Sequence, residues 1–223
     1  MWLASTLLAA GNLKRVLLVN GETPTKYADP ADRSVSLLFG DAGSATALEA
    51  VPSTTERWHF SLHSDGAGAQ DLIVKAGGFR NRFCADRRAH SVVMDGARIF
   101  NFTLKVVPPL IAEMLEMAGL DVSGPDLFVF HQSNRFIINH LVSKCGLPPA
   151  KAPIILPRFG NTGGPSIPLT ITQSVAPVRE QVLRLMLIGY GVGLSWAGAV
   201  ISLPSDAVLG HVERASGNQA VAM

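Results

Sequence analysis

The 223-residue sequence contains only two cysteines, Cys84 and Cys145. Two cysteines cannot form a disulfide framework, so the sequence excludes the small disulfide-rich secreted domains and favours a reducing compartment. Charged residues are also scarce, at 16%. The 19 basic and 17 acidic residues leave a net charge of +2. This balance lacks the basic excess that is typical of nucleic-acid-binding domains.

Long apolar runs are absent as well. No run approaches the roughly 20 residues that a membrane-spanning helix needs, and the first ten residues lack the positive charge that opens a signal peptide. Hydrophobic residues nevertheless make up 48% of the chain, which argues against disorder. We therefore expect a globular cytoplasmic protein that binds neither membranes nor nucleic acids.

Short apolar runs alternate with helical patterns along most of the chain. Apolar strands that alternate with helices are typical of an α/β layered fold with helices on both faces of a sheet. The proline pair at 108–109 is expected to start a new helix or to kink an existing one. The predicted strands are 15–19, 34–39, 44–48, 57–63, 127–130, 154–156, 182–188 and 194–202, and the predicted helices are 1–10, 99–117, 135–145 and 166–175.

Two side chains with N–H groups follow predicted strands. His131 comes directly after the run 127–130, and Asn161 lies among glycines after 154–156. Taken singly, such a histidine is more often a structural hydrogen-bonding group, and such an asparagine a turn residue. If both donors are aimed at one point, however, they can stabilise the negative charge on the oxygen of an enolate formed from a thioester.

Four segments that occur in this order resemble β-ketoacyl-ACP synthase III, a family of the thiolase superfamily. They are GDAGSATALEA (40–50), FHQSNRFI (130–137), RFGNTGGPSIPLTI (158–171) and GYGVGLSWAGAVI (189–201). The resemblance runs from residue 1 to about residue 203. It implies a thiolase-like αβαβα layered fold, with 1–51 as the remainder of the N-terminal half, 57–203 as the C-terminal half and 204–223 as a flexible tail.

The resemblance implies an acyltransferase that joins acyl-CoA to malonyl-ACP by decarboxylative Claisen condensation in fatty acid biosynthesis. Acyl carrier protein (ACP) and CoA thioesters would be its substrates, with no separate cofactor and no metal, and a homo-oligomer is expected. His131 and Asn161 would bind the malonyl thioester oxygen, and the N–H of Val192 would lie in an oxyanion hole. The residues that would line the channel for the pantetheine arm are Gly96, Phe100, Ser133 and Asn134.

The nucleophilic cysteine of this family lies at the start of a helix whose later part matches Met1 to Ala10. We therefore expect the chain to begin after the nucleophile. Neither Cys84, in an arginine-rich loop, nor Cys145, at the end of a helix, is expected to replace it, because a reactive thiol needs a setting that stabilises the thiolate. The chain alone is expected to be inactive in condensation.

Two alternatives keep the same fold. One is a non-catalytic partner subunit or acyl-binding module, and the other is a synthase for a polyketide starter or an alkylquinolone. Weaker signals are a His59/His63 pair that lacks a third zinc ligand and an arginine-rich stretch at 80–88, which is more simply a solvated loop than a phosphate or ACP site. Arg135, Lys144 and Lys151 are candidates for a basic surface that faces ACP.

The first 51 residues carry a further expectation. Strands in the centre of such a fold need cover on both faces and neighbours on both edges. Without the rest of an N-terminal half, this segment should expose apolar surface and an unpaired strand edge. We therefore expect the isolated chain to associate.

Overall fold

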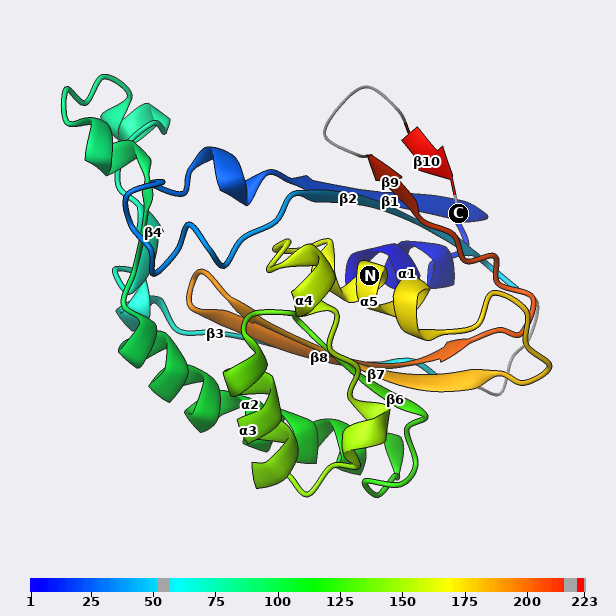
Figure 1. The fold of residues 1–223 in the computed structure, drawn as a ribbon. Helices are drawn as coiled ribbons and strands as arrows, with labels where there is room; N and C mark the ends of the chain where they lie inside the picture. Colours follow the sequence, from blue (N-terminus) through cyan, green and yellow to red (C-terminus); the bar gives the residue numbers. More distant parts are fainter. Residues whose placement is uncertain (52–56, 215–219, 223) are drawn as a thin grey trace.

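The computed structural model describes residues 1–51, 57–214 and 220–222, arranged in layers (Figure 1). The strands β1 (Arg15–Glu22) and β2 (Ala42–Glu49) form an antiparallel pair. The helices α1 (Trp2–Ala9) and α5 (Ser166–Ser174) lie between this pair and a larger sheet, whose other face is covered by α2 (Gly96–Ala118) and α3 (Arg135–Lys144). The α/β layered architecture predicted from the sequence is confirmed.

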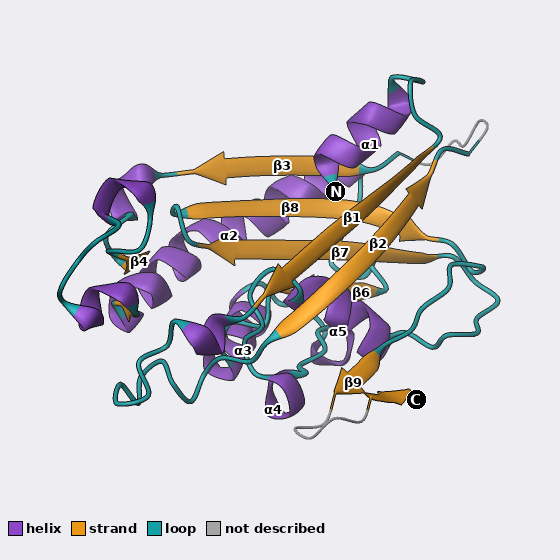
Figure 2. Ribbon diagram, turned by 90° about the horizontal axis from the view of Figure 1, so that it is seen from above, coloured by secondary structure: helices purple, strands orange, loops and turns teal. Residues whose placement is uncertain are grey.

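The larger sheet has four strands in the order β3-β8-β7-β6. The parallel pair is β6 with β7, and the other neighbours are antiparallel. Figure 2 shows β1 and β2 crossing over this sheet at an angle. The bounds of its strands are β3 (His59–Ser64), β6 (Leu127–Phe130), β7 (Leu183–Gly191) and β8 (Ser195–Leu203).

The two faces of the four-stranded sheet bury separate cores, because successive side chains of a strand point to opposite faces. In β6, Phe128 and Phe130 pack with the residues of α2 and α3, whereas Val129 packs with Ile171 and Val175 at α5. The strand residues that make these contacts are apolar on both faces of the sheet. This is the pattern of a sheet covered by helices on both sides.

The helix α2 continues through Pro108 and Pro109 from its cap at Asp95 to Gly119, so the prolines do not start a new helix. A proline has no N–H to donate to the carbonyl four residues before it. For Pro108 that carbonyl belongs to Leu104, and Nζ of Lys144 donates to it at 3.1 Å. Lys144 therefore satisfies a helix carbonyl and joins α3 to α2.

Two predicted strands are wrong. Residues 34–39 form turns closed by backbone hydrogen bonds such as Val35 to Asp32 and Leu38 to Val35, and only Phe39 makes a strand-like bridge. The run 154–156 instead leads into the short helix α4 (Leu156–Phe159), which has a proline in its first turn. Proline at that position favours a helix start, because its missing N–H is not needed there.

Several short elements have no counterpart in the sequence prediction. A two-stranded hairpin and its connection extend away from the layers beside the start of α2 (Figure 1). No helix among the described residues combines the length and apolar character needed to span a bilayer. The short elements are β4 (Leu72–Val74), β5 (Val92–Met94), β9 (Val212–Arg214), β10 (Ala220–Ala222) and the 3-10 helices η1 (Pro24–Lys26), η2 (Gly66–Gly68), η3 (Phe79–Asn81), η4 (Arg87–His90) and η5 (Pro149–Lys151).

Candidate active site

His131 is held at the end of β6 by contacts on three sides. Its backbone N–H donates to the carbonyl of Ile188 in the neighbouring strand at 2.7 Å. The imidazole meets the ring of Tyr190 edge-on, with 5.5 Å between the ring centres. On its other side, Nδ1 lies 2.8 Å from Oγ of Ser166. The parallel pairing of β6 with β7 thus fixes where this ring stands.

Desolvation by burial lowers the pKa of His131 to about 4, although the backbone of Gly163 acts in the opposite direction. A histidine with this pKa is neutral at pH 7, so one ring nitrogen carries a proton and the other does not. A neutral imidazole can donate a hydrogen bond without bringing a positive charge into the site. The ring is therefore suited to an oxygen that gains negative charge during a reaction.

Asn161 is fixed through its backbone by the segment at residues 38–40. Its N–H donates to the carbonyl of Leu38 at 2.8 Å, and its own carbonyl accepts the N–H of Gly40 at 2.9 Å. The neighbouring Gly160 has a φ of +68°, and a Cβ there would lie 3.0 Å from the Leu38 carbonyl oxygen. Only glycine combines that angle with such a close approach.

Hydrogen bonds connect the partly buried His131 to the buried Asn161 through the loop at 163–166: Ser166, whose Oγ contacts His131, donates its N–H to the carbonyl of Gly163 at 3.1 Å. Oδ1 of Asn161 accepts the N–H of Gly163 at 3.0 Å, and the backbone of the same residue acts to raise the pKa of His131. Because Oδ1 is engaged as an acceptor, the Nδ2 group of Asn161 remains to donate. The structure thus links the two side chains through the loop at 163–166.

Glu22, which was not among the predicted site residues, anchors the loop that carries Asn161. Its Oε1 accepts the N–H of Gly164 at 2.7 Å, although the two residues lie in different layers. A Cβ on Gly164 would lie 2.8 Å from that same oxygen, so a larger residue there would displace the Glu22 side chain. Glu22 ends a strand with no motif around it, and no sequence signal distinguishes it from a surface carboxylate.

Gln132, next to His131, is completely buried and joins two loops. Its Nε2 donates to the carbonyls of Phe130 at 3.1 Å and Pro153 at 3.2 Å. Its Oε1 accepts the N–H of Ile155 at 3.0 Å. A buried amide with these partners fixes the chain after β6 against the segment that leads to Asn161.

Of the residues predicted for the pantetheine channel, three lie around the start of α3. Ser133 pairs with the hydroxyl of Tyr190 at 2.8 Å, and Oδ1 of Asn134 caps α3 by accepting the N–H of Phe136 at 2.7 Å. The ring of Phe100 stacks on that of Phe136, with centres 5.4 Å apart. Gly96, the fourth, begins α2 one turn before Phe100. These contacts explain the positions structurally, and their role in binding stays a prediction.

A cleft of about 260 Å³ opens beside Asn134 and next to the loop of Asn161. It lies between the start of α3 and the segment before Phe39. Its lining combines apolar side chains with one cation. The lining residues are Leu37, Leu38, Asn134, Arg135, Leu156, Pro157 and Gly160.

Val192 lies in the turn between β7 and β8, and its side chain is 68% exposed. No backbone hydrogen bond within the described part of the chain uses its N–H. The turn follows Tyr190, which contacts the ring of His131. The structure therefore leaves this N–H available near the site, while its place in an oxyanion hole remains a prediction.

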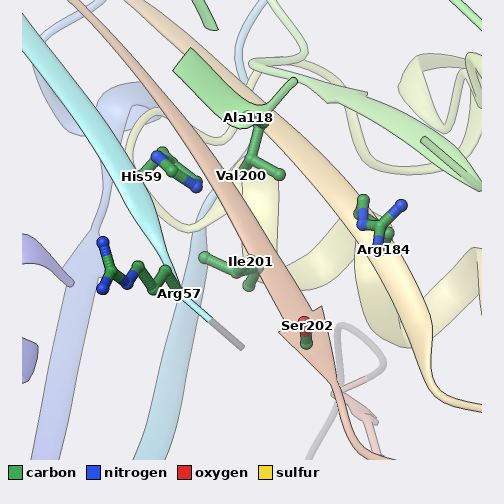
Figure 3. A pocket seen from close by; sticks show the side chains of 7 residues that line it. All are labelled: Arg57, His59, Ala118, Arg184, Val200, Ile201 and Ser202. Atoms are coloured by element: carbon green, nitrogen blue, oxygen red, sulfur yellow. The ribbon is translucent and has the colours of Figure 1, made fainter. Parts of the chain in front are cut away.

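A wider pocket of about 310 Å³ lies at the opposite end of the four-stranded sheet (Figure 3). It includes Arg57, from just before β3, and Arg184, from β7, which lie on opposite sides of β8. Strands two places apart in a sheet are separated by roughly 10 Å, and Figure 3 shows the two arginine side chains on opposite sides of β8. The register puts Arg184 five residues from the position beside His131, roughly 17 Å along the strand.

A serine, a histidine and a glutamate meet at the edge of the same sheet. Nε2 of His63 lies 2.7 Å from Oγ of Ser61 and 3.0 Å from Oε2 of Glu113. In a hydrolytic triad the two ring nitrogens contact different partners. Here one nitrogen contacts both, and Ser61 donates directly to Glu113 at 2.7 Å. The cluster therefore joins β3 to α2 and does not activate the serine.

The other weak signals also have structural explanations. His59 lines the wider pocket, and the described residues include no cluster of three or more His, Cys, Asp or Glu side chains that could hold a metal ion. Nζ of Lys151 donates to the carbonyls of Ser123 and Pro125, each at 2.7 Å. Burial raises the pKa of the Cys145 thiol, which is the reverse of what a nucleophilic cysteine needs.

The arginine-rich stretch lies on the projecting connection between β4 and β5. The guanidinium of Arg82 lies 5.3 Å from the ring centre of Phe83, and Phe83 is 90% exposed. This arrangement fits the prediction of a solvated loop.

Two family models match most of the chain. The model described as "3-Oxoacyl-[acyl-carrier-protein (ACP)] synthase III" matches residues 1–66. The model described as "3-Oxoacyl-[acyl-carrier-protein (ACP)] synthase III C terminal" matches residues 115–203. The matched segments contain β1 and β2, the β6 to α3 loop, the loop of Asn161 and the turn at Val192.

Curated relatives and solved structures agree with these matches. A β-ketoacyl-ACP synthase III of Streptococcus equi subsp. zooepidemicus is 33% identical over 208 residues, which are 90% of this chain and 63% of that protein. The corresponding protein of Desulfitobacterium hafniense is 30% identical over 202 residues, 89% of this chain and 61% of that protein. This chain therefore spans somewhat less than two thirds of the length of these relatives.

Among solved structures, a 3-oxoacyl-ACP synthase from Burkholderia xenovorans LB400 has a TM-score of 0.86 and 44% identity, covering 93% of this chain and 61% of that one. The priming β-ketosynthase of the R1128 polyketide pathway has a TM-score of 0.80 and 32% identity, covering 92% and 62%. These similarities establish the thiolase-like architecture.

Proposed function

This chain belongs to the 3-oxoacyl-ACP synthase III family, and from that premise we propose that it forms the decarboxylation site of a condensing enzyme. In this proposal His131 and Asn161 bind the thioester oxygen of malonyl-ACP. When the malonyl group loses CO₂, the electron pair of the broken C–C bond becomes an enolate, and the two N–H donors stabilise the negative charge on its oxygen. The observation that supports the proposal is the chain of hydrogen bonds through the loop at 163–166 that links His131 to Asn161.

The enolate carbon would then attack an acyl thioester, forming the new C–C bond of a 3-oxoacyl product and releasing the thiol that carried the acyl group. The complete enzyme would take acyl-CoA and malonyl-ACP as substrates in the fatty acid biosynthesis of the cytoplasm, without a separate cofactor. Cys145 does not fit the role of acyl carrier, because burial raises the pKa of its thiol. We therefore assign this chain the decarboxylation step and not its own acylation.

The test is the decarboxylation of malonyl-ACP, because this step needs no thiol nucleophile in the chain. Intact-protein mass spectrometry would follow the conversion of malonyl-ACP to acetyl-ACP. We expect His131→Ala or Asn161→Ala to lower the rate by about 10²–10³-fold, as for the loss of one oxyanion donor. Ser202→Ala, in the distant pocket, is the matched control and should leave the rate unchanged.

Equal rates for the wild type and both site variants would contradict the proposal. Tight binding of malonyl-ACP or acyl-CoA without turnover would favour the alternative of an acyl-binding module. With acyl-CoA alone, the chain should gain no covalent acyl group, so an acyl adduct on Cys84 or Cys145 would disprove the assignment of steps.

A synthase that starts a polyketide is the second candidate. It is favoured by the similarity to the R1128 priming ketosynthase, which matches this chain at a TM-score close to those of the fatty acid enzymes. Both reactions use the same decarboxylation step and differ in the acyl group that is extended. A panel of acyl-CoA substrates given to a full-length form would separate the two candidates by the product masses.

A further inference from the structure

His131 can donate to a substrate oxygen only if the proton of its neutral ring is on the nitrogen that faces the site. Nδ1 is already engaged, 2.8 Å from Oγ of Ser166, so Nε2 is the nitrogen that remains. The side chain at 166 therefore matters for the state of the ring. The position of His131 at the end of β6 does not determine which ring nitrogen is protonated, and its predicted role does not determine it either.

Ser166 is completely buried at the first position of α5, just after the glycine loop. Its hydroxyl has one proton to donate and lone pairs to accept. The backbone N–H of Gln132 points at Oγ from 3.4 Å, and an N–H can only donate. Oγ is thus an acceptor toward Gln132, and the hydroxyl proton is available for one other partner.

That other partner is Nδ1 of His131. If Nδ1 carried the proton and donated to Ser166, the serine would accept twice, and its own proton would have no acceptor among the described residues within hydrogen-bonding distance. An unsatisfied donor at a completely buried position is unfavourable, because it has lost its hydrogen bond to water without a replacement. If Ser166 donates to Nδ1 instead, every group in the contact is satisfied.

We propose that Ser166 is a positioning residue that sets the tautomer of His131: its hydroxyl donates to Nδ1, and the ring proton is therefore held on Nε2. The serine acts through the ring and does not touch the substrate. The direction of this hydrogen bond is independent of the proposed function, but its importance for catalysis rests on that function.

The carbonyl of Gly163 is a further polar group beside Ser166. It already accepts the N–H of Ser166 at 3.1 Å, and it also acts on the imidazole. Once the hydroxyl of Ser166 is removed, a bare Nδ1 loses its donor in a dry environment. No hydroxyl then favours the bare form of Nδ1, and protonation of Nδ1 becomes competitive.

Magic-angle-spinning ¹⁵N NMR of histidine-labelled chain reads the tautomer directly, whatever the size of the assembly. A protonated ring nitrogen and a bare one resonate far apart, and the signals lost in His131→Gln identify this ring. At pH 7 we expect the wild type to show a bare Nδ1 and a protonated Nε2. A protonated Nδ1 in the wild type overturns the inference, even if no variant folds.

Ser166→Ala should make the form with protonated Nδ1 detectable, and an unchanged spectrum in a folded variant also overturns the inference. Thr170→Val is the matched control. Thr170 is likewise completely buried on α5, and its hydroxyl donates to the backbone carbonyl of Ser166 at 2.7 Å. Its loss should leave the tautomer as in the wild type, and a change there would point to a general effect of disturbing α5.

The two proposals can fail separately. A ring with protonated Nε2 in a chain that does not decarboxylate malonyl-ACP contradicts the proposed function alone. A ring with protonated Nδ1 contradicts the role of Ser166, whether or not the chain decarboxylates its substrate.

Discussion

At the scale of single residues, the proposed site uses the neutral form of the His131 imidazole. Holding the ring in this form makes the folded protein less stable at low pH. Burial keeps the ring neutral by lowering its pKa to about 4. In the unfolded chain the same ring has a pKa of about 6.5. Acid therefore protonates the unfolded chain first, and folding must remove that proton.

The sign of the pH dependence follows from linkage. The stability associated with a neutral buried His131 is fully present above pH 6.5 and is lost as the pH falls toward 4, by up to about 3 kcal/mol for this pKa difference. We expect His131→Gln to weaken this loss between pH 6.5 and 4, as measured by urea unfolding over a pH series. His140→Gln, on the exposed face of α3, is the control. Identical pH profiles for wild type and His131→Gln would refute the expectation.

At the scale of elements, the loop of Asn161 depends on close backbone contact with residues 38–40. Gly40 donates to the carbonyl of Asn161, and a Cβ at Gly40 would collide with the carbonyl oxygen of Phe159. The collision involves backbone on both sides, so a rotamer change cannot relieve it. The position of Asn161 thus depends partly on Gly40, which is distant in the sequence and has no side chain.

We expect Gly40→Ala to lower the free energy of unfolding by about 1–3 kcal/mol, as for an overpacked core position. Gly21→Ala is the matched control, because a Cβ at Gly21 meets no atom within 4 Å. Denaturant unfolding of both variants checks the expectation. Equal denaturant midpoints for the two variants would contradict the expectation, because the loop would then accommodate the added methyl group without loss of stability.

The sequence predicted some elements better than others for physical reasons. The buried strand 127–130 and the helix that follows it are found because apolar periodicity and the Asn134 cap act locally. The run 154–156 is equally apolar and the run 34–39 is mostly apolar, but turn hydrogen bonds to Asp32 and the proline at 157 determine their structure. Apolar character alone does not distinguish a strand from such a segment.

The candidate site divides in the same way. The pair His131 and Asn161 could be found from the sequence, because both follow buried runs and match a family pattern. Glu22 and Ser166 could not, because their partners lie 142 and 35 residues away along the chain. Contacts of this kind depend on how the layers pack, so they cannot be predicted from a local sequence pattern.

At the scale of the whole molecule, the outer face of the β1–β2 pair is open. Leu17 and Val19 are 63% and 76% exposed, whereas Val16 and Leu18 on the same strand are partly buried toward α1. The predicted exposure of apolar surface in the first 51 residues is confirmed. Exposed apolar side chains on a strand with an unpaired edge promote association.

We expect the isolated chain to associate at tens of micromolar, and the double variant Leu17→Lys/Val19→Lys to associate less, because charges on an edge strand oppose pairing. Light scattering measures the mean mass in each case. Val208→Lys is the control, since Val208 is equally apolar and 97% exposed but lies outside this sheet. A monomeric wild-type chain would count against the prediction.

The anchoring of Asn161 by residues 38–40 means that one of the two proposed donors depends on a part of the chain that precedes both. A polypeptide from Arg57 onward would carry His131 and Asn161 but would lack the main-chain partners at Leu38 and Gly40. Residues 1–51 supplied as a separate peptide could restore those partners. Turnover would then act as a reporter of fragment complementation between the two polypeptides.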